Sequence, residues 1–94
     1  MKLILLPDAE EALFEISYFI DCMNLPGSGD KWVDKFISNL YSFARPNVRY
    51  ALCNDDYLAS LGLSCVNIND WIVAFKIEDD TFVVHKIIRG SFIV

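Results

Sequence analysis

The hydrophobic pattern of the chain changes its period once, and this change limits the fold more than any other feature. Between residues 9 and 44, apolar side chains recur every three or four positions, which is the period of an amphipathic helix. From about Leu61 onward, short runs of β-branched and aromatic residues alternate with turn-forming residues, which is typical of an antiparallel meander. A helical half followed by a stranded half predicts an α+β fold, and we expect all 94 residues to form a single domain.

The N-terminal third should contain one strand and one helix. Leu3 to Leu6 is an apolar run that predicts a short buried strand, because Pro7 then interrupts it. The first helix is expected from about Ala9 to Met23, with Asp8 as its N-cap. The apolar stripe predicted to face the core consists of Ala9, Ala12, Leu13, Ile16, Ile20 and Met23.

A second amphipathic helix is expected from about Lys31 to Ala44, after a Pro-Gly-Ser-Gly loop and with Ser28 or Asp30 as its cap. Its predicted core stripe is Val33, Phe36, Ile37, Leu40 and Ala44. Two such helices joined by a short loop predict an antiparallel helical hairpin. Both stripes should pack on one face of the sheet, with the N-terminal strand paired within that sheet.

The C-terminal half should hold the meander. Three runs predict its strands, namely Leu63 to Ile68, Trp71 to Ile77 and Phe82 to Ile88. Polar turns at Asn69-Asp70 and Glu78-Asp79-Asp80 separate them. Residues 48 to about 60 lack a clear period, so we expect an irregular segment with at most short elements.

Charge and composition limit the partners. The net charge is −5 and the isoelectric point about 4.5, whereas a protein that binds free DNA or RNA normally carries a basic field. No segment has the length of a membrane span, so we expect no membrane contact, and the cysteine pattern fits reduced thiols in a cytoplasmic protein. Hydrophobic residues make up 54% of this small chain, which favours a protein partner or a homodimer.

Cysteine and histidine are too sparse for most metal chemistry. The three cysteines, Cys22, Cys53 and Cys65, are odd in number and form no C-x-x-C pair. This pattern argues against disulfides and zinc and favours reduced thiols, with Cys65 as a small buried apolar residue. His85 is the single histidine, so no His–His metal site can form. We expect no metal and no cofactor.

Two groups of residues are candidates for partner contact. Lys76, His85 and Arg89 lie in the C-terminal strands together with Lys86, either as ordinary surface charge or as a patch for an acidic partner. Phe14 and Tyr18 lie one turn apart on the side of the first helix that faces away from its core stripe. Glu11, Glu15 and Asp21 surround them, which is the layout of an apolar contact with a charged rim. The alternative is that residues 48 to 60 fold over both rings.

Several short motifs accompany this order of elements. They are Leu13-Phe14-Glu15-Ile16 and Phe19-Ile20 in the first helix, then Leu61-Gly62-Leu63, Trp71 to Ile77, Asp79-Asp80 and Ile87-Ile88-Arg89-Gly90-Ser91. With the order strand, helical hairpin and meander, they resemble the RelE/ParE superfamily of toxin–antitoxin toxins. The resemblance implies a plasmid-stabilisation toxin of a type II module, which a cognate antitoxin neutralises by wrapping the hairpin and the sheet edge.

The departures from that family favour its non-enzymatic branch. RelE-like members cut messenger RNA on the ribosome with Lys and Arg residues around the sheet. Here the run Leu63 to Ile68 has neither, and Ser91 or Phe92 stands where a basic residue is usual. The resemblance therefore implies a ParE-like toxin that inhibits a protein such as DNA gyrase by contact, although Arg89-Gly90 replaces the common His-Gly and leaves the target open.

Two alternatives to the ParE-like function stay open. One is a RelE-like ribonuclease, whose catalytic candidates would be Lys76, Lys86 and Arg89, because such an enzyme needs cations near the reacting 2′-hydroxyl and phosphate. The other is a non-toxic interaction domain that keeps the fold, which the acidic isoelectric point supports.

Overall fold

The computed structural model describes residues 1–45 and 48–90 and has the α+β architecture that the sequence predicts. Its helices and strands follow the order β1 (Lys2–Leu5), α1 (Pro7–Met23), α2 (Ser28–Phe43), α3 (Asp56–Ser60), β2 (Ser64–Ile68), β3 (Trp71–Glu78) and β4 (Thr81–Arg89). Pro46 and Asn47, expected to stop the second helix, lie outside the described residues, and so do Ser91 and Phe92.

The four strands form one sheet in the order β1-β4-β3-β2. β1 runs parallel to β4, which confirms that the N-terminal strand joins the sheet, and the other neighbours are antiparallel. Each hairpin of the meander closes with a two-residue turn whose first residue has a positive φ, at Asn69 and at Asp79 (both +55°). Asn and Asp tolerate this conformation better than other non-glycine residues, so the polar pairs select the turns.

A β-bulge interrupts the pairing of β3 with β4. Ala74 faces Lys86 and Phe75 faces Val84, so His85 has no residue opposite it. The extra residue shifts the alternation of side chains along the rest of β4. This shift decides which side of the sheet the basic residues of β4 face.

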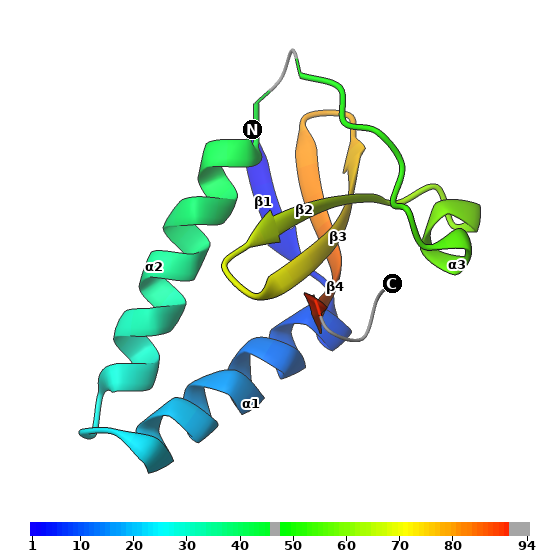
Figure 1. Cartoon of the computed structure of the whole chain (residues 1–94). Helices are drawn as coiled ribbons and strands as arrows, with labels where there is room; N and C mark the ends of the chain where they lie inside the picture. Colours follow the sequence, from blue (N-terminus) through cyan, green and yellow to red (C-terminus); the bar gives the residue numbers. More distant parts are fainter. Residues whose placement is uncertain (46–47, 91–94) are drawn as a thin grey trace.

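Helices α1 and α2 cover one face of the sheet, as predicted (Figure 1). The largest fully buried side chains in this layer include Phe36 and Leu40 of α2 and Phe75 and Phe82 of the sheet. The rings of Phe75 and Phe82 stack with their centroids 4.3 Å apart. The layer fixes the two helices to the sheet, because each such ring removes a large apolar area from water.

The two helices diverge from their connecting loop, so the hairpin is an open V whose closed end extends beyond the sheet (Figure 1). Met23 lies near that end and is 68% exposed, so its predicted place in the core is wrong. Ile20 is half-buried and does not belong to the central core. The apolar stripe of α1 extends beyond the end of the sheet, so its last residues have no surface to pack against.

Both predicted helix caps are wrong, for identifiable reasons. α1 begins at Pro7 with Leu6 as its N-cap, because proline at the first position already has a helical φ, and Asp8 falls in the first turn. α2 begins after Gly27, and neither Ser28 nor Asp30 caps it. Asp21 of α1 instead accepts a 2.7 Å hydrogen bond from the Gly29 N–H, so a carboxylate from the neighbouring helix satisfies this helix start.

Tyr50 of the irregular segment packs against Phe75 on the helix side, whereas the residues from Cys53 through α3 cover the opposite face of the sheet. Cys53 and Leu58 form a second small core there with Leu63 and Ala74. The prediction against disulfides is wrong, because Cys53 and Cys65 form one across a separation of 12 residues. The chain doubles back so that the Cys53 N–H donates to the carbonyl of Leu63 at 3.0 Å, which brings the two sulfurs together. Cys22 is free and exposed.

Candidate protein interface

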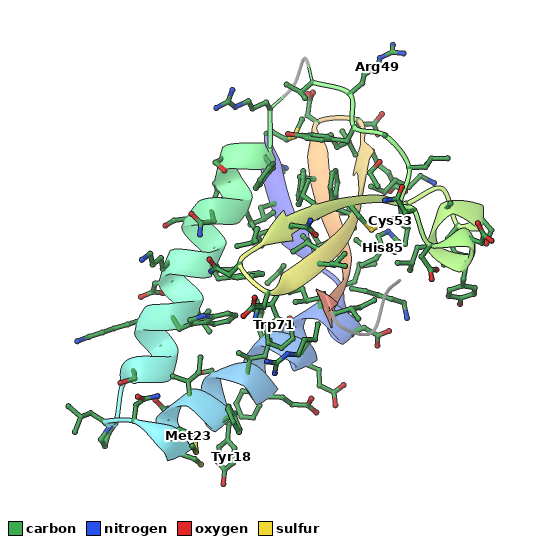
Figure 2. The ribbon with its side chains drawn as sticks, viewed as in Figure 1. Tyr18, Met23, Arg49, Cys53, Trp71 and His85 are labelled. Atoms are coloured by element: carbon green, nitrogen blue, oxygen red, sulfur yellow. A yellow bond between two sulfur atoms is a disulfide. The ribbon has the colours of Figure 1, made fainter. Side chains whose placement is uncertain are left out.

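The outer side of α1 is an apolar surface left in solvent. Phe14 is 75% exposed, Tyr18 67% and Phe19 64%. Met23 is exposed as well, but it lies on the core-stripe side of the helix, where α1 extends beyond the sheet. Figure 2 shows Tyr18 and Met23 projecting away from the sheet. We call Phe14, Tyr18 and Phe19 the α1 aromatic face. The segment from residue 48 to 60 packs through Tyr50 against Phe75 and through Cys53 and Leu58 on the other side of the sheet, and it leaves Phe14 and Tyr18 uncovered.

Acidic residues interleave with this face. Glu11 and Glu15 are exposed. Viewed along the axis of α1, both lie between Phe14 and Phe19. Asp21 was expected to belong to the rim, but it is half-buried and turned toward the start of α2. The rim is therefore acidic and consists chiefly of glutamates.

A groove adjoins the α1 aromatic face, in the space between α1, α2 and one end of the sheet. Its volume is about 350 Å³. Its lining residues are Glu15, Ile16, Phe19 and Ile20 of α1, Trp32 of α2, and Asp70, Trp71 and Arg89 of the sheet and its turn. Phe19 belongs both to the groove and to the aromatic face, so the two form one continuous surface.

Aromatic contacts hold the walls of the groove. Trp32 stacks on the buried Phe36 with 4.9 Å between centroids, and it meets Trp71 edge to face at 6.4 Å. The guanidinium carbon of Arg89 lies 5.9 Å from the centroid of the Trp71 ring, within the range of a cation–π contact. These contacts give the groove a preformed aromatic floor with one cation beside it.

The structure separates Arg89 from the other predicted basic residues. Lys76 and Lys86 lie on the side of the sheet that carries Ala74 and α3. Arg89 stacks on Trp71 on the other side, which α1 and α2 cover. The Nζ of Lys76 lies 3.9 Å from Oε1 of Glu78, and the Nζ of Lys86 lies 3.9 Å from Oδ2 of Asp8. Both ion pairs are solvent-exposed and long, so they contribute little to stability.

His85 occupies the bulge of β4. Figure 2 places it on the side of the sheet where Cys53 and α3 lie, away from Trp71. Its Nε2 is buried and has no hydrogen-bond partner among residues 1–45 and 48–90. His85 is thus separated from Arg89, although only three residues lie between them in sequence.

Sequence reasoning missed three residues of interest. Trp32 and Trp71, the two tryptophans of the chain, build the groove floor. Trp32 was assigned only to a helix, and Trp71 only to a strand and to a motif of the family resemblance. Arg49 lies in the irregular segment, and it lines a hollow together with Lys76. The two tryptophans could have been noticed because they are large aromatic residues near the ends of predicted helices and strands. Such residues often mark binding surfaces.

Other kinds of site find no support in the described part of the chain. Residues 1–45 and 48–90 contain no cluster of three or more His, Cys, Asp or Glu side chains arranged to hold a metal ion. Within the same residues, none of the helices has the length and hydrophobicity required to cross a membrane.

Comparison with known proteins adds no family. No protein-family model matches the sequence, and no curated protein matches it either. The features of the molecule that bear on its function are the exposed aromatic face, the groove and the placement of the charged residues.

Proposed function

We propose that this chain is a protein-binding domain and, more specifically, a ParE-like toxin of a type II toxin–antitoxin module. The observation that carries the proposal is the α1 aromatic face with its adjoining groove. A monomeric protein rarely leaves several large apolar side chains in solvent at one place unless a partner covers them. In this proposal the partners are a cognate antitoxin and a protein target such as DNA gyrase.

The placement of the cations weighs against the RelE-like ribonuclease. Such an enzyme, with a single histidine, needs cationic groups that converge on one phosphate and its 2′-hydroxyl. Lys86 and Arg89 belong to opposite sides of the sheet, so they cannot act on the same phosphate in this arrangement. Inhibition by contact does not require such convergence.

A toxin of this kind acts in the cytoplasm, where cellular reductants keep most thiols reduced. The proposal therefore requires that the fold persists when Cys53 and Cys65 are reduced. Two features support this. The central core lies on the helix side of the sheet, and the segment around Cys53 also has the backbone hydrogen bond to Leu63.

Induced expression in a bacterial host that lacks the antitoxin tests the proposal. Growth, plasmid supercoiling and transcript cleavage should be measured in the same cultures. We expect growth arrest with altered supercoiling and no cleavage of ribosome-bound message. Arrest with cleavage that Arg89→Ala abolishes would establish the ribonuclease, and normal growth at verified expression would leave a non-toxic interaction domain.

A further inference from the structure

The α1 aromatic face has the size of a docking site for one helix. The rings of Phe14, Tyr18 and Phe19 together leave roughly 400 Å² of apolar surface in solvent, at about 200 Å² for a whole aromatic side chain. This is about half of the ~800 Å² that each partner contributes to a standard protein interface. From Phe14 to Phe19 the face runs about 8 Å along α1, at ~1.5 Å per residue.

The occupant must be recognised through side chains. β1 pairs with β4 only as far as Val84, so within the described residues the outer edge of β4 from His85 to Arg89 has no neighbouring strand. The aromatic face itself lies on α1, whose backbone groups bond within the helix, so a partner strand has no unpaired backbone to join on that face. An amphipathic helix meets the requirement, because its own backbone is satisfied and its apolar stripe can cover the aromatic rings.

The charge around the α1 aromatic face indicates which charged residues the partner helix should carry. Glu11 and Glu15 interleave with the face, Asp70 and the single cation Arg89 line the groove, and the whole chain carries a net charge of −5. This field repels nucleic acid and anionic lipid. It also disfavours a second copy, because a two-fold contact brings the same glutamates of both copies close to each other.

We propose that the α1 aromatic face and its groove bind an amphipathic helix of a partner protein with basic residues beside its apolar stripe. One large apolar side chain of that helix enters the groove against Phe19 and Trp71, and its Lys or Arg residues pair with Glu11 and Glu15. The inference rests on the proposed function, since it describes the segment by which a partner such as the antitoxin would be recognised.

A selection from a phage-displayed library of helix-forming 16-residue peptides tests this inference. One selection uses the purified wild-type chain, and a parallel selection uses the double variant Glu11→Lys, Glu15→Lys. We expect wild-type peptides with a net positive charge around at least one large apolar residue, and acidic peptides from the double variant. Wild-type peptides should lose at least tenfold in affinity for the double variant. A consensus that is not basic, that ignores the reversal, or that never emerges would overturn the inference.

A pair of matched variants locates the binding. Phe19→Ala should weaken the selected peptides at least tenfold, whereas Tyr41→Ala, which removes another exposed aromatic ring from α2, should leave the affinity unchanged. Equal effects of the two variants would place the peptides elsewhere and overturn the inference. The selection measures binding alone, so a chain that binds basic helices without arresting growth would refute only the toxin proposal.

Discussion

Gly29 of α2 lies directly against the backbone of α1 at Ser17, and replacing it by alanine should separate the helices. A Cβ added there would lie 2.5 Å from Ser17 Oγ and 2.9 Å from the Ser17 carbonyl carbon, and nearer still to the carbonyl oxygen. The oxygen and carbon belong to the backbone of α1, so no change of rotamer relieves the contact. The helices must move apart close to the residues that line the groove.

The expected loss in unfolding free energy follows from two opposing effects. Overpacking of this kind costs about 1–3 kcal/mol, and a contact with backbone belongs at the upper end. Alanine gains about 0.5–1 kcal/mol over glycine in a helix. Gly29→Ala should therefore destabilise the protein by roughly 2 kcal/mol, which corresponds to a fall of ~10 °C in the melting temperature of a domain of this size.

Urea and thermal unfolding followed by circular dichroism measure this loss. Asp34→Ala, on the exposed side of α2, is the matched control and should change stability by less than ~0.5 kcal/mol. Adding Ser17→Ala to Gly29→Ala should not restore stability, because the backbone carbonyl remains. The reasoning is refuted if Gly29→Ala is as stable as the wild type, or if the Ser17 substitution rescues it.

Three further predictions concern the surface, the disulfide and the cations. The double variant Phe14→Asp, Tyr18→Asp should melt within a few degrees of the wild type, because both rings are exposed, yet it should lose partner binding in a pull-down; an unfolded variant would show that both rings are covered. Replacing Cys53 and Cys65 by serine should cost roughly 3 kcal/mol in urea unfolding and speed amide exchange around α3; faster exchange throughout α1 would contradict a local role. Lys86→Ala and Arg89→Ala should each leave any cleavage of ribosome-bound message at background, and an activity that either substitution removes would restore the enzyme hypothesis.

Local patterns in the sequence were sufficient for the secondary structure and for part of the interface. The period of the apolar residues, together with Asn69 and Asp79 at the turns, predicted the strands and both long helices, because these depend on neighbours within a few positions. The same period predicted that Phe14 and Tyr18 lie away from the core. Their exposure then followed, since no other segment among residues 1–45 and 48–90 covers that side of α1.

Contacts between residues far apart in sequence decided the rest. The groove unites Phe19, Trp32, Trp71 and Arg89 from four different elements, and no spacing along the chain encodes such a meeting. The disulfide depends in the same way on how the segment after residue 48 folds back onto β2. The exposure of Met23 depends on where the sheet ends. The apolar pattern of the helix contains no information about that.

The bulge at His85 shows the physical reason most clearly. Strict alternation from Phe82 onward would turn Lys86 toward the helices and Arg89 toward the opposite side. The unpaired His85 reverses both, so that Lys86 pairs beside Ala74 on the side opposite the helices and Arg89 stacks on Trp71 in the groove. The hydrophobic pattern alone predicted that Lys86 and Arg89 lie at the end of one strand. Only the register between β3 and β4 determined which side of the sheet each one faces, because a shift of one residue turns every later side chain to the other side.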